Sequence, residues 1–196
     1  NNLTGEIPST IGNLSSIKQL SFTFNNLEGN LPDEISLLTT LFFLAVGSNK
    51  LTGQIPSSMY NISTLTFFTA PDNFLYGSLP TNLGLKLPNL QIIGIAGNRF
   101  SGKIPVSITN CTKLEVIDLG DNKFEGHVPY NLGYLLNLRI LSLQGNLLGS
   151  NSAGDLNFLV PLTNCSNLEI LSLAKNNFGG ELPNILHNLS YQLTHL

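Results

Sequence analysis

The stretch Leu114–Pro129, LEVIDLGDNKFEGHVP, decides the fold, because the chain repeats its pattern from end to end. In outline it reads L-x-x-I-x-L-x-x-N-x-F-x-G-x-V-P. With the Asn of each copy as a mark, six of the seven spacings are 24 or 25 residues and the last is 30, and the marks fall at Asn1, Asn25, Asn49, Asn73, Asn98, Asn122, Asn146 and Asn176. A short unit repeated at a nearly constant period predicts a solenoid, in which each coil buries its apolar side chains only by stacking on its neighbours.

The residue types of this stretch suit one coil of such a solenoid. Ile117 and Leu119 are two apart, so on a strand they point to the same, inward face. Asn122 follows where the chain bends and leaves backbone groups without a sheet partner, and a carboxamide can both donate to and accept from such groups. Gly126 permits backbone geometry that a Cβ would resist, and Pro129 fixes φ on the far side of the coil. We therefore expect a ladder of buried asparagines: Asn25, Asn49, Asn73, Asn98, Asn122, Asn146 and Asn176.

Composition narrows the function classes. Charged residues make up 11% of the 196 residues, against about 25% in typical soluble domains, and the net charge is −3. No basic stripe is present, so neither nucleic-acid binding nor direct membrane contact is expected. The longest apolar run, Leu41–Val46, is far too short to cross a bilayer.

The chain begins and ends within a repeat. We interpret residues 1–196 as a single solenoid segment of a longer protein, with about seven full repeats and partial repeats at both ends. Because no polar capping repeat is visible, the terminal coils are expected to expose Leu3, Ile7, Leu193 and Leu196.

The seventh copy departs from the pattern after Gly149. In the irregular insertion 150–161, the expected G-x-I-P element gives way to the sequence that begins SNSAGDLNFLVP. Asp155 could cap a helix there, with Leu156, Leu159 and Val160 on one helical face. The sequence therefore predicts one or two helical turns on the convex side, and a plain loop is the alternative.

The L-x-G-x-I-P element resembles the plant-specific class of leucine-rich repeats over the whole chain. This resemblance implies an α/β solenoid: a right-handed leucine-rich-repeat superhelix with a parallel concave β-sheet, and mostly loops and short 3-10 or helical turns on the convex side. A narrower segment, GDLNFLVPLTNCSNLEILSLAKNNFGGELPNILHNLS, resembles ectodomains of plant receptor-like kinases of the flagellin-sensing and bacterial-blight-resistance subfamily.

That second resemblance implies a function. The chain would be an extracellular ligand-recognition segment of a single-pass plasma-membrane receptor, with a Ser/Thr kinase outside it. It would bind a peptide or protein ligand on its concave face in immune or developmental signalling, with a co-receptor ectodomain as a second partner. A kinase-less receptor-like protein, or a secreted repeat inhibitor of a foreign enzyme, is the alternative.

Six N-x-[ST] sequons accompany the repeats and suit a secreted protein. Four of them stand 12 residues before a ladder Asn, which places them at one position on the coil. An Asn- and Ser-rich chain also forms sequons by chance, so composition is the alternative explanation. The candidate glycosylation sites are Asn2, Asn13, Asn61, Asn110, Asn164 and Asn188.

The two cysteines are expected to be buried and unpaired. Cys111 and Cys165 occupy the same inward position two coils apart, or roughly 10 Å at about 4.8 Å per coil. A disulfide needs Cα atoms within about 7 Å of each other.

No enzyme chemistry is expected. The acidic cluster of Glu115, Asp118 and Asp121 has no His or nucleophile beside it. His127, His187 and His195 lack metal-ligand spacing, no kinase motif is present, and we predict no cofactor, metal or catalytic residue.

The outward rows of the concave strands are the candidate binding surface. Their first row is an apolar stripe that includes Phe43, Phe67 and Ile92, and such stripes mark docking surfaces when they are exposed. The alternative is that these side chains shield the sheet's own core. The ligand-binding candidates are Phe43, Phe67, Asp72, Ile92, Asp118, Asp121, Arg139, Gln144 and Lys175.

Overall fold

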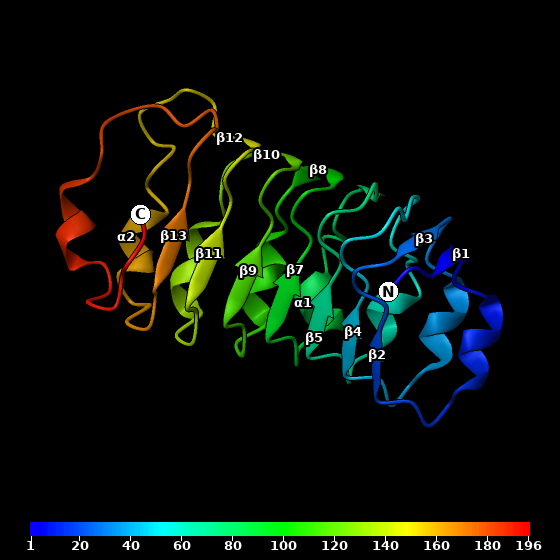
Figure 1. Ribbon diagram of the computed structural model, residues 1–196. Coiled ribbons are helices and arrows are strands. Elements are labelled where there is room, and N and C mark those ends of the chain that lie inside the picture. The colour runs from blue at the N-terminus through cyan, green and yellow to red at the C-terminus, as the bar shows by residue number, and fades with distance from the viewer.

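A seven-stranded parallel sheet runs along one side of the computed structural model, which describes residues 1–196 (Figure 1). Successive coils contribute neighbouring strands, and equivalent residues pair, for example Phe43 with Phe67 and Phe67 with Ile92. Each strand covers the positions at which the repeat alternates outward and inward residues. The strands are β2 (Gln19–Ser21), β4 (Phe43–Ala45), β5 (Phe67–Thr69), β7 (Ile92–Gly94), β9 (Val116–Asp118), β11 (Ile140–Ser142) and β13 (Ile170–Ser172).

A second set of parallel strands follows the ladder asparagines. These strands form a four-stranded sheet, β12-β10-β8-β6, and a separate pair, β1-β3. The sequence did not predict this second sheet, because its strands are short and lie in the stretch that we assigned to the bend. They are β1 (Thr4–Glu6), β3 (Asn26–Glu28), β6 (Tyr76–Gly77), β8 (Arg99–Lys103), β10 (Lys123–Gly126) and β12 (Leu147–Leu148).

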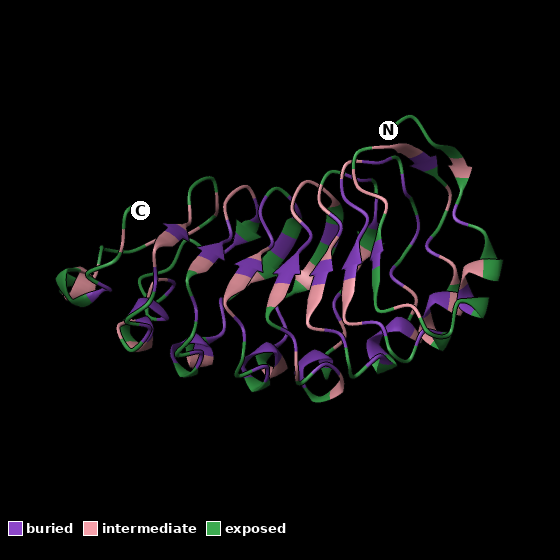
Figure 2. Cartoon of the chain, turned by 60° about the horizontal axis from the view of Figure 1, so that its bottom comes forward, coloured by how far each residue is buried: buried purple, intermediate pink, exposed green.

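Short helices form the convex side, along the lower border of Figure 2. In five coils a proline stands directly before a five-residue 3-10 helix, as Pro105 does before Val106. Proline fixes φ and has no N–H to leave unpaired, which suits the residue that begins such a helix. The helices are η1 (Ser9–Asn13), η2 (Asp33–Leu37), η3 (Met59–Asn61), α1 (Leu83–Lys86), η4 (Val106–Asn110), η5 (Tyr130–Tyr134), α2 (Leu159–Leu162) and η6 (Asn184–Asn188). The predicted leucine-rich-repeat solenoid is confirmed.

One hydrophobic cluster of 46 buried residues fills the space between the sheets and the helices. The middle residue of each concave strand points into it, as Leu44, Phe68 and Ile117 do. At the terminal coils, Leu3 and Leu196 are exposed as expected. The prediction for Ile7 was wrong, because its side chain is only 5% exposed and belongs to the same cluster.

The insertion forms the predicted helical turn, α2, which packs against η5 of the preceding coil. The predicted role of Asp155 was wrong. Phe158 precedes α2, and the buried Asp155 carboxylate instead accepts backbone N–H groups of Ser150, Ser152 and Gly179 at 2.9, 3.0 and 3.0 Å. An irregular loop leaves N–H groups without partners, and a carboxylate can accept several of them at once.

The predicted apolar helical face was also only partly right. Leu159 is buried, whereas Val160 is 42% exposed. None of the helices has the length and apolar character that crossing a bilayer requires.

Candidate functional site

The asparagine ladder fixes the geometry from which the concave rows project. The Asn122 side-chain amide donates to the carbonyls of Ile95, Leu119 and Gly120, and its oxygen accepts the N–H of Phe100 at 2.9 Å. The same set of bonds recurs in Asn49, Asn73 and Asn146, which are also buried. Three members lie at partly buried positions: Asn25, Asn98 and Asn176. Asn98 and Asn176 keep the full set of contacts, whereas Asn25 lacks the bond to a carbonyl of a preceding coil.

The first outward row forms a continuous apolar stripe on the seven-stranded sheet. The rings of Phe43 and Phe67 stack with centroids 4.2 Å apart and planes inclined by 15°. Ile92 stands beside Phe67 on the next strand. All members except the exposed Gln19 are half-buried: Phe43, Phe67, Ile92, Val116, Ile140 and Ile170. The stripe therefore both covers the sheet and presents apolar area to solvent.

Two polar candidates near the middle of the sheet, Asp118 and Gln144, are linked through the hydroxyl of Ser142. The Ser142 hydroxyl donates to the Asp118 carboxylate at 2.5 Å and lies 2.8 Å from the side-chain amide of Gln144. Asp118 also accepts the N–H of Gly120 at 3.3 Å. Asp118 and Gln144 are thus brought together, and part of the hydrogen-bonding capacity of Asp118 is already used.

The residues directly before the ladder asparagines are not strand residues but turn residues with left-handed backbone. Asp72 has φ +52° and Asp121 has φ +49°, and glycine fills the same position at Gly97 and Gly145. Asp72, Asp121 and Lys175 are exposed there. Phe24 has the same geometry and is 73% exposed, which is unusual for a bulky side chain. Phe24 was not among the binding candidates chosen from the sequence.

Arg139 is not a free cation. Its guanidinium forms two hydrogen bonds to the Glu169 carboxylate, at 2.8 and 3.0 Å. This pairing lowers the pKa of Glu169 and raises that of Arg139. Arg139 and Glu169 stand directly before the first residues of the paired strands β11 and β13. Their equivalent positions in the repeat could therefore have identified the ion pair from the sequence.

The second sheet carries a surface that sequence reasoning missed. Phe74 and Tyr76 are 43% and 49% exposed, and the Arg99 guanidinium lies 4.9 Å from the centre of the Phe74 ring. In the sequence, Phe74 and Tyr76 alternate with the buried Leu75 directly after a ladder Asn. This two-residue alternation was the available signal for an extended segment with an outward face.

Both cysteines are free and buried. The Cys111 thiol lies 3.2 Å from the Leu87 carbonyl, and the Cys165 thiol lies 3.4 Å from that of Leu135. Burial raises the pKa of each thiol to about 11. No three His, Cys, Asp or Glu side chains gather as a metal site would require.

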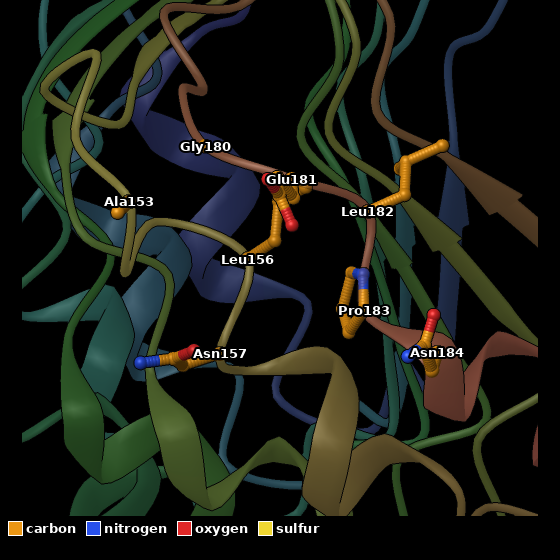
Figure 3. Close-up of a pocket in the computed structure, with 8 residues that line it drawn as sticks. All are labelled: Ala153, Leu156, Asn157, Gly180, Glu181, Leu182, Pro183 and Asn184. Carbon is orange, nitrogen blue, oxygen red and sulfur yellow. The ribbon is translucent and has the colours of Figure 1, made fainter.

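A pocket of about 590 Å³ opens between the insertion and the following coil (Figure 3). Ala153, Leu156 and Asn157 form one wall, and residues 180–184 form the other. Its only ionisable side chain is that of Glu181. The pocket therefore has room for a small molecule, but no group of ionisable side chains converges in it.

A comparison with protein families matches the Leucine Rich Repeat model at residues 89–111, 113–135 and 167–189. A receptor-like protein kinase of Arabidopsis thaliana is 53% identical over 62 residues, 32% of this chain and 6% of that protein. The receptor kinase-like protein Xa21 of Oryza sativa subsp. japonica is 47% identical over 62 residues, with the same coverage of 32% and 6%. The aligned segment is thus a small part of each relative.

Solved structures extend the similarity to the whole chain. The leucine-rich-repeat ectodomain of the Arabidopsis receptor kinase GASSHO1/SCHENGEN3, in complex with CASPARIAN STRIP INTEGRITY FACTOR 2, is 34% identical with a TM-score of 0.88, covering 96% of this chain and 22% of that one. The Arabidopsis receptor kinase HAESA, in complex with the peptide hormone IDA and the co-receptor SERK1, is 29% identical with a TM-score of 0.88, covering 100% and 32%. The chain is a leucine-rich-repeat solenoid, and the proteins it resembles are plant receptor kinases, of which it spans a small part.

Proposed function

We propose that this segment recognises an extended peptide on the concave sheet of an extracellular receptor. The observation that carries the proposal is the apolar stripe that begins with the stacked pair Phe43–Phe67. Half-buried aromatic rings lose little conformational freedom when a partner covers them, because packing already holds them in place. They are therefore suited to anchor a ligand.

Charged side chains near the stripe would set the position of the peptide. Asp72 and Asp121 are exposed, lie in neither of the two salt bridges of the chain, and are positioned by left-handed turns of the backbone. Lys175 occupies the equivalent position further along. Apolar anchors beside spaced charges give affinity and register respectively, which suits a peptide that lies across several coils and places a basic residue near Asp121.

The relatives support a proposal for the wider assembly. GASSHO1/SCHENGEN3 and HAESA are receptor kinases, and the HAESA complex holds both a peptide and a co-receptor. We propose the same plan for the parent of this chain, with a Ser/Thr kinase outside the segment, a single membrane anchor and a co-receptor ectodomain as second partner.

The test uses the ectodomain that contains this segment. Peptides that it retains from plant extracellular fluid are identified by mass spectrometry and resynthesised, and their affinities are measured by calorimetry. Phe67→Ala and Asp121→Lys should each weaken binding about tenfold or more, the range for truncating an anchor residue. Phe74→Ala, an equally aromatic site just before β6 of the second sheet, and Asp33→Lys, on the convex side, are matched controls.

Two results separate this proposal from its competitors. Unchanged affinity in both Phe67→Ala and Asp121→Lys, with an unchanged melting temperature, would rule out the concave face of this segment. A loss of affinity in Phe74→Ala instead would move the binding surface to the second sheet.

A further inference from the structure

From Asn13 to Asn164, sequons alternate with exposed apolar side chains along the convex edge. The fifth residue after the coil proline is Asn13, Leu37, Asn61, Leu85, Asn110 and Tyr134 in successive coils. Asn164 lies two residues after the end of α2, and Asn188 lies five residues after Pro183. We call this line of residues the convex-edge column. Its sequon asparagines are all exposed, and its apolar members Leu37, Leu85 and Tyr134 are 57%, 69% and 65% exposed.

Members of the column in neighbouring coils lie close together. A Cβ added to Gly12, the residue before Asn13, would lie 3.1 Å from the Leu37 Cδ1. A Cβ added to Gly84, the residue before Leu85, would lie 3.1 Å from the Asn110 Cβ. Leu37 therefore lies near Asn13 and Leu85 near Asn110. Tyr134 ends η5, which packs against η4, the helix that ends at Asn110.

The sequon asparagines also differ from their neighbours in hydrogen bonding. Lys86 donates to the Asn61 Oδ1 at 2.9 Å, which leaves the Asn61 Nδ2 without a partner. The Nδ2 atoms of Asn13, Asn110, Asn164 and Asn188 have none either, whereas Asn89, Asn137 and Asn167, outside sequons, donate theirs to the preceding coil. The Nδ2 atom is the one that N-glycosylation uses, so it is available where the sequence motif allows modification.

We propose that N-linked glycans at Asn13, Asn61, Asn110 and Asn164 lie over Leu37, Leu85 and Tyr134, so that sugar covers the apolar members of the convex-edge column. In the modification, the Asn Nδ2 loses a proton and bonds to the anomeric carbon of the first N-acetylglucosamine, while the bond from that carbon to a lipid pyrophosphate donor breaks. Sugar rings present both C–H faces and hydroxyls, so they can pack on apolar side chains and still face water.

The physical need for such a cover comes from the exposed area. Large apolar side chains repeated along one line favour association with other molecules unless something covers them. A bulky, hydrated glycan on alternate coils solubilises the surface without filling the concave face. The convex edge would then be closed to protein partners, which leaves the two sheets as the accessible faces.

The test is hydroxyl-radical footprinting of the chain secreted from a eukaryotic host, after peptide mapping of each sequon. Enzymatic removal of the glycans from the folded protein should raise labelling of Leu37, Leu85 and Tyr134 severalfold. Labelling of Leu147, an exposed leucine on the second sheet, should not change. The pair of substitutions N61Q/N110Q, which flank Leu85, should raise labelling at Leu85, whereas N2Q/N188Q should not.

Occupied sites with unchanged labelling, or sites at these four asparagines that carry no glycan, would overturn the proposal. Neither readout involves a ligand, so its failure is distinguishable from failure of the proposed peptide recognition. Serine replacements of Leu37, Leu85 and Tyr134 give an independent check: deglycosylation should increase self-association of the wild-type chain and not of the triple variant.

Discussion

The carboxamide oxygen of Asn122 accepts the backbone N–H of Phe100, 22 residues earlier in the chain, at 2.9 Å. A side chain of one coil thus satisfies the backbone of the coil before it, while its amide group satisfies carbonyls of both coils. Coil-to-coil attachment therefore depends on buried polar contacts as well as on apolar stacking.

Replacement of Asn122 by Ala should lower the free energy of unfolding by about 1–3 kcal/mol, the cost of leaving buried backbone groups unsatisfied. Chemical denaturation measures the loss. Asn137→Ala removes only an exposed bond to the Thr112 carbonyl and should have little effect. Equal losses in the two variants would show that the ladder contributes nothing specific.

Stability should fall at acidic pH through Asp155. Hydrogen bonds from the Ser150 and Ser152 backbones lower the pKa of its carboxyl in the folded state. Its contribution is therefore present above the ordinary carboxyl pKa of about 4 and is lost as pH falls below it toward the folded-state pKa. Melting temperatures between about pH 2 and 6 should vary less in Asp155→Asn than in the wild type. The exposed Asp72→Asn is the control, and a profile equally steep in Asp155→Asn would contradict the assignment.

The cysteines should not react in the native protein. Because burial raises the pKa of Cys111 and Cys165 to about 11, little thiolate forms at neutral pH. Alkylation followed by mass spectrometry should leave both unmodified until denaturant is added, and should then modify both. A bridged species in the non-reduced protein would contradict the stacking geometry.

Gly97→Ala should destabilise the chain. The residue has φ +64°, and the left-handed region costs an L-residue about 1–2 kcal/mol. The added Cβ would also lie 2.5 Å from the Asp72 Oδ1, which would have to move. Gly97→Asn should lose less stability than Gly97→Ala because Asn tolerates this region. Thermal melts compare both with Gly154→Ala, where the nearest atom is the flexible Asn157 amide at 3.3 Å.

The concave sheet and its inward residues could be predicted because their two-residue alternation recurs at a constant period. Phe68 and Ile117 point inward for the same reason that Leu44 does. The second sheet could not be predicted in the same way. Its strands pair with an offset, Lys123 with Ser101 for example, and depend on how the bend after each ladder Asn is oriented.

In the insertion, the local sequence was not sufficient to predict the role of Asp155. A carboxylate before an apolar run serves equally well as a helix cap or as an acceptor for loop N–H groups. One of the groups that Asp155 binds, the Gly179 N–H, comes from the next coil, so its role depends on tertiary structure. The engagement of Asp118 by Ser142 likewise depends on contact between strands of different coils.

The same junction has a mechanical consequence. The four-stranded second sheet ends at β12, so beyond it the two lines of strands no longer run together. The following coil is attached through β13, α2, the Asp155 carboxylate and the ladder bonds of Asn176, without a further strand in the second sheet. Under tension that pulls the two ends of the solenoid apart, the coils from β6 to β12 share load through both sheets, and the coil after Leu148 is held mainly through one sheet. Rupture should therefore begin at the insertion, and the coils before it should come apart at higher force.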